Sequence, residues 1–392
     1  IAEFNSRARL STWKYKSEWE NLTRRIGFWL DFEHPYITYE NSYMESLWWI
    51  FKKIHEQGLL KKLYKVVAWC PRCQTPLSNH ELGQPDVYRK VKDPSVYVKF
   101  EIKDQKSKPK NKEYFLVWTT TPWTLPANVA IAVNPKLTYT KFSVKDESSP
   151  DGRAGASGEK VEFFWSYNPP PKTPGLEISV VEKISGSKLL GRRYEPLYKS
   201  AKAKVSEKIG DYRVLAGDFV TTLEGTGLVH IAPAFGEDDL ELIKQANQKH
   251  GSASLLDIPV TIDDRGNVLK GFPGAGKFIK EADKDIAADL RGRNLLYHES
   301  VIEHEYPFCW RCSTPLIYFV RLAWFIEMSK LRGELLAANQ KINWIPKHIK
   351  EGRFGEWLKE AKDWAISRER YWGTPLPIWE CAACESHLVI GS

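Results

Sequence analysis

Long apolar runs and leader signals are both absent from this 392-residue sequence. No stretch of 18 apolar residues occurs, which excludes a membrane-spanning helix of ordinary length. No charged-then-apolar segment opens the chain, which excludes a secretory signal. The hydrophobic content of 42% fits a globular protein, and the length allows two or three domains. We therefore expect a cytoplasmic protein without a membrane partner.

A strong excess of one charge is also missing. The 57 Lys and Arg residues outnumber the 49 Asp and Glu residues and give a formal net charge of +8. Such a surplus helps a protein to bind a polyanion, but it is also common on ordinary solvated surfaces. A starting methionine is missing too, since the first residue is Ile1, and the tail CAACESHLVIGS ends just after a cysteine pair. We expect a piece of a longer protein.

Cysteine is scarce, but its six residues are not scattered. They form three CxxC pairs, in WCPRCQTPL, FCWRCSTPL and WECAACES. Two thiolates at this spacing on a tight turn can face one ion, so each pair is typical of half of a tetrahedral zinc site. The pairs are Cys70 with Cys73, Cys309 with Cys312, and Cys381 with Cys384.

The first two pairs share the pattern Cys-x-Arg-Cys-x-Thr-Pro-Leu, which predicts that they close one four-thiolate site. Four thiolates leave no open position for water, so the expected zinc is structural and no catalytic metal is expected. Disulfides are the alternative, which a cytoplasmic setting disfavours. The third pair lacks a matching partner pair and is expected to be under-ligated in this chain.

The character of the sequence changes along the chain and divides it into five segments. Helical apolar spacing dominates residues 1–65 and returns in residues 321–392, which also carry the third cysteine pair. Between the first two pairs, short β-branched runs such as SVYVKFEI and VAIAV are typical of strands. The predicted segments are 1–65, a first knuckle segment at 66–90, a β-rich domain at 91–300, a second knuckle segment at 301–320, and 321–392.

The stretch WTTTPWTLP at 118–126 places three threonines at the end of a predicted strand. Tyr114 to Trp118 is an aromatic and β-branched run, and Pro122 cannot continue a ladder, so the strand should end near Thr121. Ligands often bind at such strand ends in mixed α/β folds. The alternative is that threonine is simply a good strand former.

The segment GTGLVHIAPAFGEDDLELIKQANQKHG at 225–251 predicts a strand carrying His230, a turn, and an amphipathic helix. Glu237, Asp238 and Asp239 fall in the first turn of that helix, where carboxylates usually complement the dipole or cap the end. One of them could instead point into a pocket shared with His230. A carboxylate, an imidazole and a row of hydroxyls suit the recognition of an ammonium group and an ester. A lone histidine after a strand is more often structural.

The segments WTTTPWTLPANVAIAVNP and GTGLVHIAPAFGEDD together resemble the editing domain, called CP1, of the isoleucyl-tRNA synthetase family, a class I synthetase. CPRCQTPLS, CWRCSTPL and ISRERYWGTPLPIW are similar to that family too, so the resemblance covers nearly the whole chain. The valyl and leucyl relatives typically have TTRPxT where this chain has TTTPWT, and valyl enzymes have lysine at the position of His230. No HIGH-like sequence and no KMSKS loop occurs, so what the family uses to bind ATP and activate the amino acid is largely missing.

The resemblance implies an α/β fold in which a β-barrel-like editing domain is inserted into an incomplete Rossmann-type core with zinc-ribbon knuckles. It also implies a reaction. A missing methylene is worth only about 1 to 3 kcal/mol in an apolar pocket, a magnitude for which this family is itself the standard example, so valine is charged by mistake and a second sieve must remove it. The implied function is hydrolysis of Val-tRNA(Ile), while the parent enzyme ligates isoleucine to tRNA(Ile) with ATP.

The resemblance also carries over the site residues of the editing reaction. Asp239 would hold the α-ammonium group of the substrate, and His230 and Trp123 would wall the side-chain pocket. The threonine hydroxyls would orient the terminal ribose of the tRNA and the attacking water. The implied catalytic residues are Thr119, Thr120, Thr121 and Asp239, and the implied substrate-binding residues are Trp123, Asn128 and His230.

Three alternatives to an isoleucyl editing fragment stay open at this point. The chain could be a zinc-ribbon RNA-binding module without chemistry, in which the threonines and His230 are ordinary strand residues. It could be the editing domain of a valyl or leucyl relative. It could also be a complete ligase, against which the missing motifs argue. The expected partners are the acceptor end of tRNA(Ile) and valine as the edited amino acid, and we expect a monomer.

Overall fold

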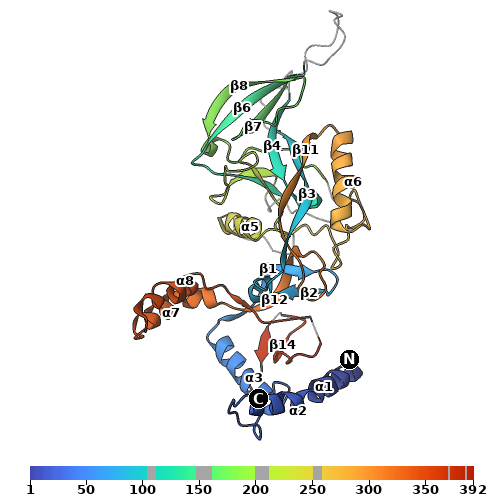
Figure 1. The fold of residues 1–392 in the computed structure, drawn as a ribbon. Coiled ribbons are helices and arrows are strands. Elements are labelled where there is room, and N and C mark those ends of the chain that lie inside the picture. The colour runs from blue at the N-terminus through green and yellow to red at the C-terminus, as the bar shows by residue number, and fades with distance from the viewer. Residues whose placement is uncertain (104–111, 147–160, 199–211, 250–257, 370, 385) are drawn as a thin grey trace, which may run out of the picture. The chain divides into compact units, whose positions relative to one another are not determined.

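The computed structural model describes residues 1–103, 112–146, 161–198, 212–249, 258–369, 371–384 and 386–392, which form two compact units (Figure 1). Unit 1 combines Ile1–Leu63 with Leu322–Ser392, and unit 2 is Tyr64–Arg321. The strands β1 (Leu60–Cys70) and β12 (Ile317–Ile326) carry the chain out of unit 1 and back into it. Among the described residues, no helix combines the length and apolarity needed to cross a bilayer.

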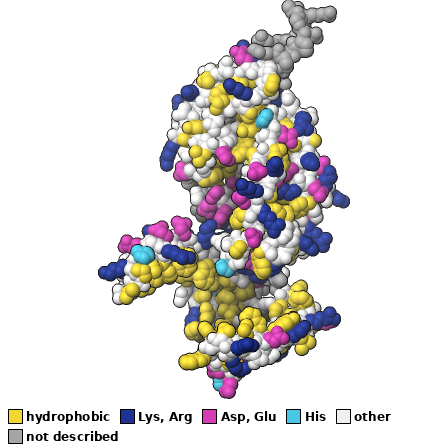
Figure 2. All heavy atoms as spheres, in the orientation of Figure 1, with side chains coloured by type: hydrophobic (Ala, Val, Ile, Leu, Met, Phe, Trp, Pro, Cys, Tyr) yellow, Lys and Arg dark blue, Asp and Glu magenta, His cyan; other side chains and the backbone are white. Residues whose placement is uncertain are grey.

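Unit 1 is mainly helical and buries little of its apolar surface. The helix α3 packs one face, on which Leu47, Phe51 and Ile54 recur at helical spacing, into a small core. By contrast, α1 and α2 bury no residue, and large side chains such as Trp29 remain on the surface, 95% exposed. Figure 2 shows hydrophobic side chains on the surface of the molecule. The elements are α1 (Ala2–Lys14), α2 (Lys16–Arg25), α3 (Asn41–Glu56), η4 (Met328–Leu331), α7 (Arg332–Gln340), η5 (Lys347–Ile349), α8 (Arg353–Lys359), β13 (Trp364–Ala365), β14 (Ile378–Glu380) and β15 (His387–Val389).

Unit 2 is built on a six-stranded sheet with the order β11-β3-β4-β7-β6-β8. Neighbouring strands are antiparallel except β4 and β7, which run parallel. The helix α6 (Ile279–Gly292) lies alongside β3 and β11 in Figure 1, because Ile279, Ala282, Ile286 and Leu290 form one buried stripe. The strands are β3 (Tyr88–Glu101), β4 (Glu113–Thr119), β6 (Thr138–Asp146), β7 (Val161–Ser166), β8 (Leu176–Ser185) and β11 (Leu296–Pro307).

A second sheet of unit 2 has the order β10-β5-β9. Its central strand β5 (Ala130–Val133) is buried at every position, which explains why the sequence there is a continuous apolar run rather than an alternating one. β10 (Val229–Ile231) pairs antiparallel with β5, and β9 (Arg213–Ala216) pairs parallel with it. The remaining elements of unit 2 are β2 (Thr75–Leu77), α4 (Asn79–Leu82), η1 (Pro122–Ala127), η2 (Gly186–Lys188) and α5 (Glu237–Lys249).

The α/β prediction is confirmed, because unit 2 combines helices with mixed sheets around shared cores. β4 ends at Thr119, two residues before Thr121. The reason is local: the Thr119 hydroxyl accepts the backbone N–H of Thr121 at 3.2 Å, so a side chain replaces the next bond of the ladder. The strand end and the turn at Pro122 therefore hold the threonines where η1 begins.

Candidate active site

The threonines at the end of β4 form a chain of hydroxyl groups. Thr119 Oγ1 lies 3.3 Å from Thr121 Oγ1, and Thr121 Oγ1 lies 3.2 Å from Thr124 Oγ1. Thr124 Oγ1 in turn lies 3.0 Å from His230 Nε2. Thr120 is half-buried and takes no part in this chain. The structure thus brings Thr119, Thr121 and His230 together, as the sequence predicted, through a residue that the sequence did not single out, Thr124.

The bonding partners of Thr124 assign a direction to this network. Its hydroxyl lies 2.8 Å from the carbonyl oxygen of Thr121, which can only accept, so Thr124 donates there. Having only one proton, the Thr124 hydroxyl must accept from its other neighbours, Thr121 Oγ1 and His230 Nε2. His230 therefore carries its proton on Nε2, and its Nδ1 is left as an acceptor.

His230 is placed on β10 opposite Ile131 of β5, and its side chain is 7% exposed. Burial lowers the pKa of His230 from its ordinary value of 6.5 to about 4, so the imidazole is neutral at physiological pH. Its Nδ1 is buried without a hydrogen-bond partner in the described structure. Buried polar atoms are normally paired, so this atom is an exception among the described residues.

Asp239 is the carboxylate of the α5 first turn that points inward. Its Oδ2 accepts the backbone N–H of Ala232 at 2.8 Å, two residues beyond His230. Gly236 makes this possible, since a Cβ there would lie 2.6 Å from Asp239 Cγ. Burial raises the pKa of Asp239 to about 6, and the nearby charge of Asp238 raises it further. The hydrogen bond from Ala232 acts in the opposite direction and lowers it. Asp238 itself is exposed, as is Glu237.

The structure gives Trp123 and Asn128 strong interactions of their own. The Trp123 ring packs edge-on against Phe235 with centroids 4.8 Å apart, and its Nε1 is buried without a partner in the described structure. Asn128 Nδ2 donates to the Ala130 carbonyl at 2.8 Å, and Asn128 Oδ1 accepts from the Tyr194 hydroxyl at 2.6 Å. These contacts hold the turn from η1 into β5, and the substrate-binding roles of both residues stay predictions.

Sequence reasoning missed Thr124 and Gly236, although both lie inside the segments it quoted. Thr124 follows Thr121 by three residues, which is the spacing that a 3₁₀ turn brings face to face, and this was a signal that could have been used. A glycine just before β10, Gly227, also makes a close backbone approach. Gly227 has a φ of +70°, and a Cβ there would lie 2.5 Å from Tyr167 Cβ.

The first two cysteine pairs meet in one cluster, as predicted. The Sγ atoms of the four residues all lie within 4.8 Å of one another, and Cys70 Sγ is 3.4 Å from Cys312 Sγ. Zinc bound to four thiolates at about 2.3 Å needs sulfur–sulfur distances of about 3.8 Å, so this cluster could hold a metal ion of that kind. Its members are Cys70, Cys73, Cys309 and Cys312, all free of disulfides.

The two halves of the cluster have the same backbone geometry. In each, the residue after the second cysteine has a positive φ, +50° at Gln74 and +55° at Ser313. In each, the N–H of that residue donates to the carbonyl of the first cysteine at 2.8 Å. Burial would raise the pKa of the Cys312 thiol, but hydrogen bonds from Thr314 and from the neighbouring thiols hold it at about 6. Burial raises the pKa of the Cys70 and Cys73 thiols, so a metal ion that binds here must displace their protons.

The third pair has no such environment. Cys381 and Cys384 are both exposed, and no group of three or more potential ligands forms around them within the described part of the chain. Cys384 Sγ lies 3.1 Å from the Ser386 hydroxyl. A metal at this pair stays a prediction that needs further ligands.

The sequence matches the family described as tRNA synthetases class I (I, L, M and V) over residues 1–391. The chain therefore belongs to the class I tRNA synthetases. Among curated relatives, the isoleucine--tRNA ligase of Thermus thermophilus is 44% identical over 394 residues, covering 100% of this chain and 35% of that protein. The isoleucine--tRNA ligase of Picrophilus torridus is 42% identical over 392 residues, again covering 100% of this chain and 35% of the relative. The predicted resemblance to isoleucyl-tRNA synthetase is confirmed, and the chain spans about a third of the length of these relatives.

A weaker likeness exists to solved structures. The editing domain of the P. knowlesi cytosolic leucyl-tRNA synthetase is 12% identical, with a TM-score of 0.37, and the match covers 53% of this chain and 96% of that one. A likeness of this degree carries no argument about the chemistry of the present chain.

Proposed function

We propose that this chain carries the editing site of an isoleucyl-tRNA synthetase and hydrolyses the ester of Val-tRNA(Ile). The observation that carries the proposal is the hydroxyl–imidazole network from Thr119 to His230. The inward carboxylate of Asp239 lies close by, bonded to the backbone of Ala232 just after β10. The two curated relatives, both isoleucine--tRNA ligases, support isoleucine as the amino acid of the parent enzyme. Ligation with ATP belongs to that parent enzyme.

Asp239 binds the α-ammonium group of the substrate in this proposal. One carboxylate oxygen is used by the Ala232 N–H, which fixes the side chain, and the other can accept from the ammonium group. A charge-assisted hydrogen bond in a partly desolvated position is stronger than one at the surface. The carboxylate must be ionised for this contact, and with a pKa of about 6 it is mostly ionised at neutral pH.

The threonine hydroxyls position the reacting ester and the attacking water. Thr119 and Thr121 are held in place by each other and by Thr124, so their remaining lone pairs point from a rigid base. The neutral imidazole of His230 is too weakly basic, with a pKa of about 4, to be the main general base. Catalysis then depends on orientation shared among several groups, with Thr120 as a further candidate at the half-buried edge.

The size of the pocket supplies the discrimination between valine and isoleucine. His230 is buried and fixed by Thr124, so it cannot swing aside to make room for an extra methylene. In this proposal Trp123, 4% exposed, is a second wall of the pocket, and Asn128 holds the backbone that leads from η1 into β5. Close-packed walls of this kind reject a group that is one methylene too large.

The remaining proposals concern the setting of the site. We place the editing domain at residues 91–300, as a β-barrel-like insertion in an incomplete Rossmann-type core made by residues 1–65 and 321–392. Structural zinc binds the four-cysteine cluster, and the knuckle segments are 66–90 and 301–320. The partner is the acceptor end of tRNA(Ile), and the protein acts as a monomer in the cytoplasm.

The direct test is deacylation by the purified chain. Release of labelled amino acid from Val-tRNA(Ile) is expected to exceed release from Ile-tRNA(Ile) by about 10-fold or more, the discrimination that one methylene allows. A zinc-ribbon RNA-binding module would bind the tRNA and release neither amino acid. Equal release of both amino acids would contradict the sieve.

Shortening the pocket wall should relax the discrimination. We expect His230→Ala to release isoleucine from Ile-tRNA(Ile), so that the preference for the valyl ester falls by about 10-fold or more, because the vacated space accepts the additional methylene. His80→Ala, a change at an exposed histidine of the knuckle segment, serves as the control and should keep the wild-type preference. A His230→Ala variant that stays folded and keeps its preference would place the specificity wall elsewhere.

A further inference from the structure

A buried carboxylate on α6 holds the backbone of the threonine segment from behind. Asp283 is 2% exposed, and its Oδ1 accepts the backbone N–H of Trp123 at 2.9 Å. The two residues are 160 positions apart in the chain and come from different elements. Asp283 belongs to none of the motifs that define the proposed editing site.

The N–H of Trp123 needs a partner that η1 cannot supply. The first N–H groups of a helix have no acceptor within the helix, and Pro122, the first residue of η1, has no N–H at all. Trp123 is buried, so water cannot replace the missing acceptor. Asp283 thus acts as a capping residue contributed by a distant helix.

The position of η1 sets the geometry of the hydroxyl network. The carbonyl of Thr121 accepts both the N–H and the hydroxyl of Thr124, so the first turn of η1 decides where the Thr124 hydroxyl lies. Thr124 then orients His230. A shift at Trp123, between these two threonines, therefore changes the relative placement of the reacting groups.

We propose that Asp283 is a positioning residue for the editing reaction, which fixes the start of η1 and through it Thr121, Thr124 and His230. The proposal rests on the proposed function. Asp283 contacts neither substrate nor reacting atoms in it, and acts by way of the Trp123 backbone.

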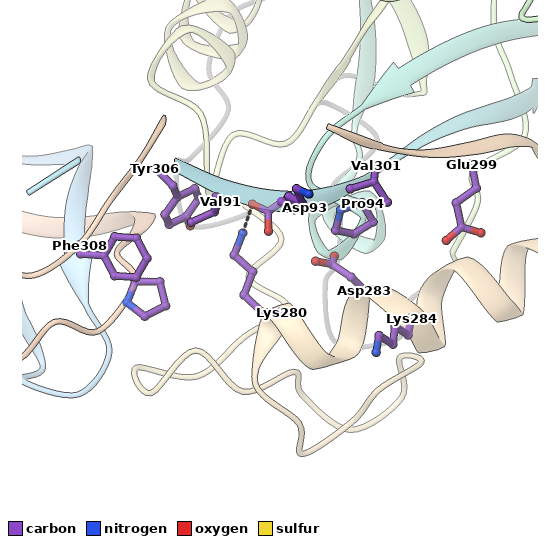
Figure 3. Close-up of a pocket in the computed structure, with 12 residues that line it drawn as sticks. Val91, Asp93, Pro94, Lys280, Asp283, Lys284, Glu299, Val301, Tyr306 and Phe308 are labelled. Carbon is purple, nitrogen blue, oxygen red and sulfur yellow. Dashed lines mark hydrogen bonds and ion pairs between the residues drawn. The ribbon is translucent and has the colours of Figure 1, made fainter. Parts of the chain in front are cut away.

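The other face of Asp283 borders a cavity of about 480 Å³ between α6 and the strands β3 and β11 (Figure 3). In it, Lys280 is paired with Asp93, which also lies 3.0 Å from His304 Nε2. Burial raises the pKa of Asp283 to about 7, and the charge of Asp93 acts in the same direction. The hydrogen bond from Trp123 and the charge of Lys280 act in the opposite direction and lower it. The titratable groups that line this cavity beside Asp283 are Lys280 and Lys284 of α6, Lys92 and Asp93 of β3, and Glu299 and Tyr306 of β11.

These surroundings show that Asp283 is held in place for more than charge pairing. Lys280, whose charge acts on Asp283, is engaged by Asp93 and lies 4.1 Å from the centroid of the Tyr306 ring. The carboxylate of Asp283 instead accepts a hydrogen bond from the backbone of η1. A buried carboxylate of this kind is costly unless it makes a specific bond.

The test compares Asp283→Ala and Asp283→Asn with Asp285→Ala, a half-buried position on the same helix whose side chain pairs with Lys277 at 2.7 Å. Two readouts are taken from each variant: kcat and KM for deacylation of Val-tRNA(Ile), and hydrogen–deuterium exchange of the peptide spanning residues 119–127. We expect Asp283→Ala to lower kcat by about 10- to 100-fold with KM changed by no more than about twofold, and to speed exchange in that peptide. Asp283→Asn keeps an oxygen that can accept the Trp123 N–H, so it should recover most of the wild-type kcat and most of the protection from exchange. Asp285→Ala should match the wild type.

Wild-type kcat and unchanged exchange in Asp283→Ala would overturn the proposal, as would an equal loss in Asp285→Ala. Faster exchange throughout unit 2 in Asp283→Ala would indicate general destabilisation, and the Asp283→Asn variant then decides. A folded Asp283→Asn variant that does not recover kcat would also overturn the proposal. If the wild type releases no amino acid, the proposed function fails. The exchange readout still decides in that case whether Asp283 holds η1.

Discussion

Asp239→Ala is expected to abolish most of the hydrolysis of Val-tRNA(Ile), while Asp238→Ala stays near the wild type. The two carboxylates are neighbours in the first turn of α5, but only Asp239 turns inward onto Ala232, and Asp238 is exposed. Losing one half of a buried charged contact costs on the order of 2 to 4 kcal/mol of transition-state binding, or about 30- to 700-fold in kcat/KM. The measurement is release of labelled valine from charged tRNA.

Asp239→Asn separates the charge of this residue from its structural bond. The amide oxygen can still accept the Ala232 N–H, so the turn is kept, but the ammonium group loses its counter-charge. We expect the Asn variant to be as inactive as the Ala variant. Wild-type activity should fall as the pH is lowered through about 6, where Asp239 becomes protonated.

The same substitution should stabilise the fold at high pH. The folded pKa of Asp239, about 6, lies above its ordinary value of 3.8, so the native state binds more protons between these values. The contribution of this group to stability is therefore present below about pH 3.8 and is lost as the pH rises through 6. At pH 8, Asp239→Asn should raise the free energy of unfolding, measured in urea, by on the order of 1 to 3 kcal/mol.

Equal activity of the Asp239→Ala and Asp238→Ala variants would mean that the wrong carboxylate has been placed in the pocket.

Local chemistry made part of the site predictable. Three hydroxyls before a proline indicated a strand end, and the structure places Thr119 there because its hydroxyl takes the Thr121 N–H. The approach of His230 to these threonines required the pairing of β10 with β5, about 100 residues away in sequence, and no local pattern specifies such a pairing. The family resemblance supplied what periodicity could not.

Contacts that depend on backbone groups were the hardest to foresee. Asp283 reads in the sequence as an ordinary polar position of an amphipathic helix, yet it falls on the buried face between Ile279 and Ile286. Its partner is an N–H group, which every residue but proline has, so the sequence contains no sign of which one it meets. Thr124 was hidden for a similar reason, since its role depends on η1 being a 3₁₀ turn.

The cysteine site, by contrast, was predictable from the sequence, because the spacing and the shared pattern of the pairs indicate almost all of it. The left-handed residues Gln74 and Ser313 after each pair show that the pattern encodes one turn used twice. The sequence also predicted that the two turns meet in one site. The cluster of four sulfur atoms within 4.8 Å confirms this for the described structure.

Removal of the metal is expected to have the largest effect on stability. Cys70 and Cys73 lie near the start of unit 2, and Cys309 and Cys312 lie near its end, so a bound zinc ion clips the two ends of that unit together. Apparent binding energies of structural zinc in small peptides are about 10 to 16 kcal/mol at neutral pH, and a part of this stabilises the fold. We expect the reduced chain to contain tightly bound zinc, and chelation to lower its melting temperature.

Cysteine substitutions provide the matched comparison. Cys70→Ser with Cys309→Ser should lose the zinc and lower the melting temperature, because both thiols are buried and come from opposite halves of the cluster. Cys381→Ser with Cys384→Ser changes the exposed pair in unit 1 and should leave both zinc content and melting temperature nearly unchanged. Metal analysis that finds no zinc on the wild-type chain would contradict the assignment. The assignment would also be contradicted if the Cys381→Ser/Cys384→Ser variant lost the zinc while the Cys70→Ser/Cys309→Ser variant kept it. In the latter case the four clustered thiols would stabilise unit 2 only by packing, since Cys70 and Cys309 are both fully buried.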